Sequence, residues 1–228
     1  MLGAHTHNTW EKPMQIVLYY APVACSLVPY VTLTEAGASF EVRTINLRKQ
    51  QQMSPEYLAI NPKHKVPLLV VDGQTLSENV AIQQWVARQF PAAKLLPADP
   101  WQELQAISLM SWCASAIHPY LTRLNSPPKV CDVPGTEASV RRHAIEGLFD
   151  GLKIADDKLA GREHFFDHFT AADVHFYWCW HRAKLFQDVD LSGFRNCVAH
   201  HERLQRRASI AKVLAYEKSV MAEFAKAA

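Results

Sequence analysis

The sequence has few cysteines, and they form no recognisable pattern. There are five in 228 residues, and none belongs to a C-x-x-C motif. They are Cys25, Cys113, Cys131, Cys179 and Cys197. An odd, widely spaced set excludes a disulfide framework and a cysteine-based zinc cluster. Free thiols are typical of a reducing compartment, so we expect a cytoplasmic protein without a bound metal.

Excess charge and long apolar runs are also absent. The 24 basic and 22 acidic residues give a formal net charge of +2 at pH 7, which indicates neither nucleic acid nor an anionic membrane as a partner. No apolar run approaches the roughly 20 residues of a membrane-spanning helix. Residues 1–14 lack the apolar core of a signal peptide, and we expect them to form a disordered extension. The remaining chain is long enough for two small domains.

The stretch around Cys25 organises the predicted fold. A short run of β-branched and aromatic residues, 16–20, predicts a buried strand. After a break at Pro22, apolar residues recur at helical spacing, and Gly37 is placed to end that helix. Cys25 would then lie against the positive end of a helix dipole, where the thiolate form is favoured. The alternative is that Cys25 is simply a small buried apolar residue.

Strands and helices alternate in the next part of the chain. Three further strands are predicted, at residues 40–47, 66–71 and 74–76. The last two are joined by Asp72-Gly73, which favours an antiparallel hairpin. A weak helix is predicted around residues 55–58 and a stronger one over 80–90. This alternation predicts one compact α/β domain over residues 15–92.

Beyond residues 91–97, which resemble a linker, only helices are predicted. The predicted helices cover residues 101–124, 137–159, 174–186, 198–207 and 210–225, the first interrupted near His118. They would form an all-helical domain over residues 98–228. Thr170 and Asp173 have the spacing of a capping box, so we expect Asp173 to have a structural role.

Four short motifs resemble those of the cytosolic glutathione transferases. They are A-C-S-L at residues 24–27, N-P-K-H-K-V-P at 61–67, L-S-E-N-V-A-I at 76–82 and F-T-A-A-D-V at 169–174. The first motif resembles the bacterial beta class, which has a cysteine at this position. The resemblance extends from Gln15 to near the C-terminus. It implies a thioredoxin-like N-terminal domain of βαβαββα order followed by an all-helical domain.

The same resemblance implies where glutathione, as co-substrate, would bind. Cys25 and His118 would be catalytic at its sulfur, and a cis bond would join Val66 to Pro67. The residues implied for the rest of glutathione are Lys49, Lys65, Val66, Pro67, Glu78 and Asn79. Ser26 and Ser115 would be secondary hydrogen-bond donors. Without the resemblance, Glu78 is an ordinary acidic residue at a helix start and His118 a core histidine.

The implied activity is conjugation of the glutathione thiolate to a small apolar electrophile by a homodimer. We expect Trp112, Tyr120 and Trp178 to line the electrophile cleft. Two other functions stay open: a glutathione-dependent thiol–disulfide reductase or lyase with Cys25 as nucleophile, and a non-catalytic scaffold of the same fold. Where the beta class often has asparagine, glutamate and lysine, this chain has Ser111, Ala116 and Pro119. Contacts from a second subunit at those positions are therefore not implied.

Overall fold

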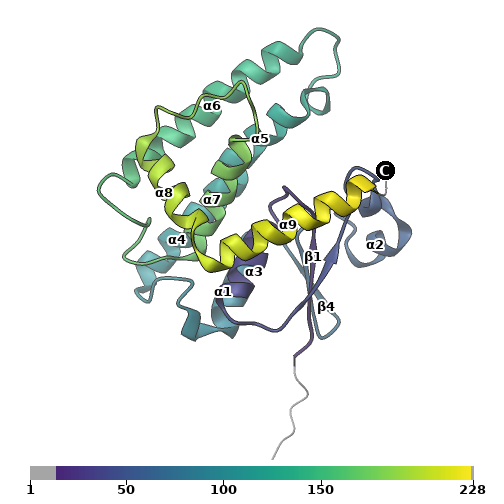
Figure 1. The fold of residues 1–228 in the computed structure, drawn as a ribbon, viewed down its shortest axis with the longest axis vertical. Helices are drawn as coiled ribbons and strands as arrows, with labels where there is room; N and C mark the ends of the chain where they lie inside the picture. The colour runs from purple at the N-terminus through teal and green to yellow at the C-terminus, as the bar shows by residue number, and fades with distance from the viewer. Residues whose placement is uncertain (1–13, 227–228) are drawn as a thin grey trace, which may run out of the picture.

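A four-stranded sheet forms the first layer of the molecule (Figure 1). The computed structural model describes residues 14–226, so all of the predicted extension except Met14 lies outside the described residues. The strands are β1 (Ile16–Tyr20), β2 (Glu41–Thr44), β3 (Leu68–Val71) and β4 (Gln74–Ser77). Their order is β2-β1-β3-β4, with β2 parallel to β1 and the other pairs antiparallel. Leu18 of the central strand β1 lies opposite Val42 and Leu69 and is fully buried.

All four predicted strands are present, but two are shorter than predicted. β2 stops at Thr44 because the side-chain oxygen of Asn46 accepts the backbone N–H groups of Arg48 and Lys49, which turns the chain away from the sheet. β3 begins only at Leu68 because the preceding Pro67 has no N–H to donate to the ladder.

Three helices complete the N-terminal part of the chain. They are α1 (Leu27–Glu35), α2 (Pro55–Ile60) and α3 (Asn79–Gln89). Each residue from Leu27 to Leu33 is buried, because α1 is packed between the sheet and helices of the C-terminal part. Gly37, at φ 65°, ends this segment as predicted. The order βαβαββα around a mixed four-stranded sheet is thioredoxin-like, as the sequence motifs imply.

The rest of the described chain is helical. Its helices are α4 (Pro100–Trp112), α5 (His118–Asn125), α6 (Glu137–Lys158), α7 (Ala171–Ala183), α8 (Arg195–Gln205) and α9 (Ala208–Lys226). A π-helical segment, Cys113–Ile117, joins α4 to α5, which explains the predicted interruption before His118. Within residues 14–226, no helix combines the length and apolarity needed to cross a membrane.

Helices α7 and α9 connect the two layers. α7 lies inside the helical bundle, and every residue from Ala171 to Trp180 is buried. α9 runs back from the bundle along α1 and ends near α2, so the C-terminal segment lies beside the sheet (Figure 1). α7 is in contact with α1, and its Trp178 side chain donates a hydrogen bond to the carbonyl of Val23, so this helix joins the bundle to the sheet domain.

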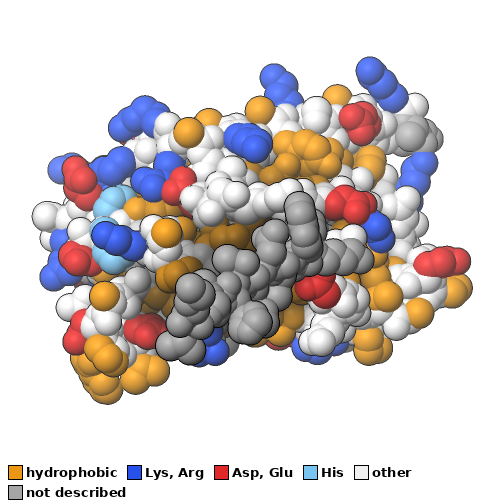
Figure 2. Space-filling view, turned by 90° about the horizontal axis from the view of Figure 1, so that it is seen from below, with side chains coloured by type: hydrophobic (Ala, Val, Ile, Leu, Met, Phe, Trp, Pro, Cys, Tyr) orange, Lys and Arg blue, Asp and Glu red, His pale blue; other side chains and the backbone are white. Residues whose placement is uncertain are grey.

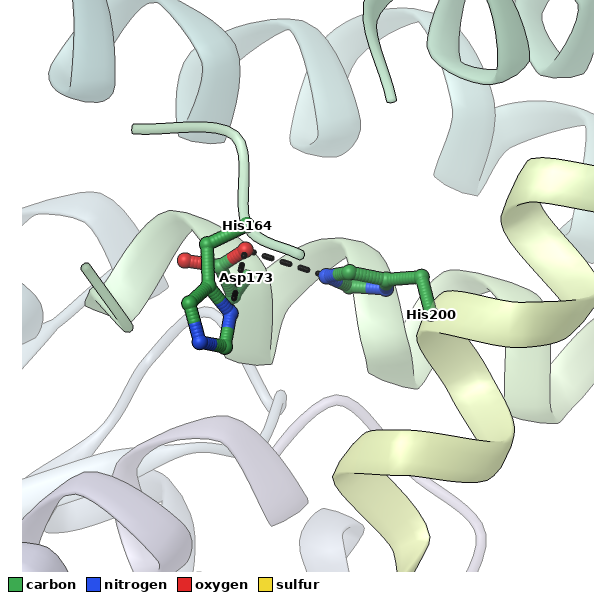
Figure 3. A group of neighbouring side chains, drawn as sticks. All are labelled: His164, Asp173 and His200. Atoms are coloured by element: carbon green, nitrogen blue, oxygen red, sulfur yellow. Dashed lines mark hydrogen bonds and ion pairs between the residues drawn. The ribbon is translucent and has the colours of Figure 1, made fainter. Parts of the chain in front are cut away.

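The start of α7 is fixed by a buried carboxylate (Figure 3). Asp173 Oδ2 accepts the backbone N–H of Thr170 at 2.8 Å and its hydroxyl at 2.9 Å, which confirms the predicted capping box. Asp173 Oδ1 also accepts from the backbone N–H of Phe165 and from His200 Nε2, both at 3.0 Å. Burial alone would raise the pKa of Asp173, but hydrogen bonds from His164 and His200 hold it well below its usual range.

We predict that Asp173→Ala lowers the free energy of unfolding by about 3–5 kcal/mol, because it leaves several buried donors without a partner. A depressed pKa stabilises the fold above the unfolded-state value of about 3.9, and this contribution is lost as the pH falls. The gap between wild type and variant should therefore narrow below about pH 4. Urea unfolding across pH 3–7 measures both effects. The exposed Asp167→Ala, six residues away, is the control, and an equal loss in both variants would contradict the prediction.

Candidate active site

Three segments that are far apart in the sequence meet at Cys25. The residue lies in the loop between β1 and α1, and its thiol donates a hydrogen bond to the carbonyl oxygen of Val66 at 3.5 Å. The carbonyl of Cys25 accepts from the side-chain amide of Asn79 at 3.2 Å. The structure thus brings together the cysteine, the Val66–Pro67 segment and the start of α3.

The Cys25 thiol is protonated at neutral pH. Burial raises its pKa to about 12, Asn79 acts in the opposite direction, and the Glu78 carboxylate adds to the rise. The predicted thiolate is therefore wrong for this structure. A helix dipole contributes only about 0.3–1 kcal/mol at an exposed terminus, whereas each pKa unit of desolvation corresponds to about 1.4 kcal/mol. Desolvation therefore has a larger effect on the pKa of Cys25 than the helix dipole.

The loop before Cys25 is held in a conformation that valine rarely adopts. Val23 has φ 67°, in the left-handed region that a β-branched residue strongly disfavours. Its N–H donates to Glu217 Oε2 at 2.7 Å, and its carbonyl accepts from Trp178 Nε1 at 3.3 Å. The same Glu217 oxygen accepts the hydroxyl of Tyr20 at 2.7 Å. Helices α7 and α9 therefore fix the position of the loop.

The segment before β3 is fixed by side chains from α2 and its C-terminus. The carbonyl of Lys65 accepts the hydroxyl of Tyr57 at 2.6 Å and the side-chain amide of Asn61 at 2.7 Å. The next two residues, Val66 and Pro67, are buried and joined by the cis bond that the resemblance implies. The backbone of this segment is therefore presented to Cys25 in one orientation.

Glu78 and Asn79 begin α3 in contrasting environments. Glu78 has φ 73°, and its exposed carboxylate forms an ion pair with Lys63 Nζ at 2.7 Å. Such exposed pairs contribute little stability, so the carboxylate can exchange partners. Asn79 is buried, and its side-chain oxygen has no hydrogen-bond partner among the described residues. A buried unpaired acceptor is uncommon and favours a binding role.

His118 lies across the cleft from Cys25. It begins α5, and its ring packs edge-on against Trp178 with centroids 4.6 Å apart. Burial lowers its pKa to about 4, with the charges of Arg182 and Lys65 adding to the effect. The imidazole is neutral at pH 7, so one ring nitrogen can donate a hydrogen bond and the other can accept one.

Cys25 and His118 share one cleft of about 690 Å³, which we call the thiol cleft. Lys65, Val66 and Trp178 also line it, as the sequence predicts for glutathione and electrophile contacts. Lys49 lines a second cleft of about 500 Å³ that adjoins the first. Glu78 and Asn79 do not line either cleft, but they lie beside Cys25 at the edge of the sheet.

Besides Pro67, Glu78 and Asn79, four predicted residues do not line either cleft. The Ser26 hydroxyl is buried and bonds only the backbone of Ala21, and Ser115 is exposed elsewhere on the segment before α5. Trp112 packs beside α6 and lines a different cleft. Tyr120 packs so closely on α6 that only a glycine fits at position 147. Both aromatic residues pack against α6.

One cluster has the composition of a metal site. Among the described residues, only His164, Asp173 and His200 place three potential ligand atoms within 4.8 Å of one another (Figure 3). The Asp173 carboxylate already accepts bonds from Thr170, Phe165 and His200. Hydrogen bonding at the start of α7 accounts for this arrangement, and the cluster does not line the thiol cleft.

Comparison with known proteins identifies the family. The sequence matches the glutathione S-transferase N-terminal domain over residues 14–88. It is 30% identical over 205 residues to the glutathione S-transferase GstA of Escherichia coli O157:H7, covering 88% of this chain and 98% of that protein. The chain belongs to the glutathione S-transferase family. It is also 31% identical over 163 residues to the maleylacetoacetate isomerase of Rattus norvegicus, covering 69% of this chain and 73% of the relative.

A solved structure of the same family has a matching fold. The sphingomonad glutathione S-transferase complexed with glutathione is 30% identical to this glutathione S-transferase, with a TM-score of 0.78. The match covers 89% of this chain and 98% of the other. Sequence reasoning found the family motifs but missed Glu217 and Arg182, because one charged residue on an otherwise ordinary helix gives no signal of its position.

The raised pKa predicts slow alkylation of Cys25. At pH 8 its reaction with iodoacetamide should be at least about 100-fold slower than that of Cys131, whose thiol pKa is lowered mainly by a hydrogen bond with Thr136. The Cys25 rate should rise about tenfold per pH unit between pH 7 and 10, because the thiolate fraction rises in this way below the pKa. Mass spectrometry of peptides assigns each site, with Cys131 as internal control. A Cys25 rate that reaches a plateau below pH 8 would contradict the raised pKa.

Proposed function

We propose that this family member is a beta-class or beta-like glutathione transferase that conjugates the glutathione thiolate to small electrophiles. One observation supports this most: a single cleft contains the Cys25 thiol, the neutral His118 imidazole and the backbone of Val66. A cysteine and a histidine at these positions match the beta-class motifs in the sequence. Glutathione bound to the related sphingomonad enzyme supports the choice of co-substrate.

In this proposal, glutathione lies along the edge of the sheet. Its peptide backbone would pair with Val66, in the manner of an added strand. Its charged α-amino group would meet the exposed carboxylate of Glu78, and its α-carboxylate the free N–H groups at the start of α3. Lys49 and Lys65 would meet the glycyl carboxylate.

The proposed chemistry uses two neutral groups. His118 would donate a hydrogen bond to the glutathione sulfur from its neutral imidazole, because a pKa lowered to about 4 makes it too weak a base to hold the thiol's proton, which passes to water. Cys25, with its raised pKa, would donate a hydrogen bond to the resulting thiolate. The sulfur then attacks the electrophile in a cleft that excludes water.

A second function, thiol–disulfide reduction, is favoured by the same cysteine. Cys25 is partly exposed in the thiol cleft. As a thiolate it would attack the glutathione sulfur of a mixed disulfide, form a disulfide with it and release the other thiol. The raised pKa of Cys25 disfavours this reaction, so we place conjugation first.

We also propose the assembly in which this chemistry occurs. Residues 15–92 would bind glutathione and residues 98–228 the electrophile, in a cytoplasmic homodimer. Trp101 and Leu104 on α4 support the homodimer, because these large apolar side chains are 69% and 57% exposed in the single chain.

Removing the Glu78 charge tests the binding mode. We predict that Glu78→Gln weakens glutathione binding by about 10- to 100-fold, because a charge-assisted hydrogen bond to the α-amino group is lost. Titration calorimetry measures this. The control is Glu41→Gln, which removes an exposed, ion-paired carboxylate on β2. Equal affinities of wild type and Glu78→Gln for glutathione would show that Glu78 does not bind it. If the wild type does not bind glutathione at all, the non-catalytic scaffold is favoured instead.

Cys25→Ser separates the two chemistries. Serine still donates a hydrogen bond to a thiolate but forms no mixed disulfide. We therefore predict that conjugation of 1-chloro-2,4-dinitrobenzene survives within about tenfold, whereas any disulfide reductase activity is lost. His118→Ala should reduce both reactions. Both turnovers are measured side by side on the same preparations. Retention of reductase activity in Cys25→Ser would show that the cysteine is not the nucleophile.

A further inference from the structure

The thiol cleft and the adjoining 500 Å³ cleft form one continuous site. They share six lining residues: Pro22, Val23, Leu47, Arg48, Asn125 and Arg182. The thiol cleft contains Cys25 and His118, and the second cleft is lined by apolar side chains from α9 and from the turn after α7. These include Leu185 and Met221, which are 50% and 44% exposed. We call the second one the apolar cleft.

Positive charge is concentrated in this site. Its described lining residues include Arg48, Lys49, Lys65, Lys129 and Arg182, and none is an aspartate or glutamate. The chain as a whole is nearly balanced, with 24 basic and 22 acidic residues. On the face shown in Figure 2, basic and acidic side chains are mixed. The 1380 Å³ cleft beside α4 and α6 also has both signs. The excess of positive charge is therefore confined to the site that the thiol cleft and the apolar cleft form together.

Arg182 is the most enclosed of these cations, and no carboxylate within residues 14–226 forms an ion pair with it. It lies near the C-terminal end of α7, where the two clefts meet. Its guanidinium donates to the side-chain oxygen of Asn125 and lies 4.7 Å from the centre of the Phe186 ring. The nearby Glu217 carboxylate is engaged by Tyr20 and Val23.

An enclosed guanidinium that no carboxylate contacts directly is unfavourable in the free protein. Burial lowers the pKa of Arg182, and the charge of Glu217 offsets only part of this effect. Arginine is also the side chain best suited to bind a carboxylate through two parallel hydrogen bonds. Such a group in a cleft favours an anionic ligand that completes the pair.

Glutathione does not account for Arg182. Its two carboxylates have partners in the proposed pose, at the start of α3 and near Lys65 and Lys49. Arg182 belongs to α7, a helix of the C-terminal part, and lines both clefts, whereas these partners of glutathione all belong to the N-terminal part. The remaining ligand is the electrophile.

We propose that the electrophile is an anion, with an apolar body in the apolar cleft and a carboxylate bound by Arg182. This substrate class rests on the proposed function. Arg182 is a specificity-determining residue: it holds the carboxylate while the glutathione sulfur attacks the apolar body. With an aryl chloride, the carbon–sulfur bond forms, the carbon–chlorine bond breaks and chloride leaves. With an unsaturated acid, sulfur adds to one carbon of the double bond and the other takes up a proton.

The test uses two electrophiles that differ in one charge: 4-chloro-3,5-dinitrobenzoate and 4-chloro-3,5-dinitrobenzamide. For each, kcat/KM is divided by the rate constant of the uncatalysed reaction with glutathione. The wild type should prefer the carboxylate. In Arg182→Gln the ratio of carboxylate to carboxamide should fall by about 10- to 100-fold. Arg123→Gln removes an arginine of α5 that lines neither cleft, and it should leave the ratio unchanged.

A binding measurement keeps this proposal separate from the proposed function. The unreactive 3,5-dinitrobenzoate should bind wild type at least about tenfold more tightly than Arg182→Gln, with 3,5-dinitrobenzamide as the neutral reference. This affinity shows whether Arg182 binds a carboxylate even if no conjugation is detected. If glutathione is bound and conjugated but the ratio and the benzoate affinity are unchanged in Arg182→Gln, the anionic electrophile is overturned and the proposed function stands.

Discussion

The position of Cys25 depends on one buried carboxylate from the far end of the chain. Glu217 of α9 accepts hydrogen bonds from the hydroxyl of Tyr20 and the N–H of Val23. Trp178 of α7 holds the carbonyl of Val23 from the other side. A valine at φ 67° costs of order 1–3 kcal/mol, so this loop conformation exists because tertiary contacts enforce it. The cleft therefore requires the helices as well as the sheet.

Enclosure between the sheet and the helices also determines the protonation of the site. Desolvation raises the pKa of Cys25 to about 12 and lowers that of His118 to about 4. Both groups are neutral at physiological pH. The charged residues that line the cleft are positive, and they include Lys65 and Arg182. Such a site is prepared to stabilise an anionic sulfur that arrives with a ligand, rather than to generate a thiolate on its own cysteine.

Local patterns in the sequence were sufficient for the fold. The four strands follow from short apolar runs and from the hairpin at Asp72, and the helices from apolar periodicity. The capping box was visible because Thr170 and Asp173 are three residues apart. Its further partner His200 was not, because the contact between α7 and α8 has no local signature.

The site was only partly predictable, for the same physical reason. Cys25, Val66 and Asn79 belong to short motifs and were found to lie together. An aromatic residue on a helix gives no indication of which face is buried. Of the three aromatic residues named from the sequence, only Trp178 lines the thiol cleft, and Trp112 and Tyr120 lie outside it. The pKa of Cys25 depends on burial by segments that are distant in the sequence. The local helix dipole therefore predicted a lowered pKa, whereas the pKa is raised.

The crystal structure of the protein with reduced glutathione tests the central claim most directly. We predict that the tripeptide lies along Val66 with its α-amino group at Glu78. Its sulfur should lie within hydrogen-bond distance of Cys25 Sγ, without a covalent bond, and on the side of the cleft that faces His118. Glutathione bound away from Val66, or with its sulfur out of reach of Cys25, would contradict the claim that these segments form a glutathione site.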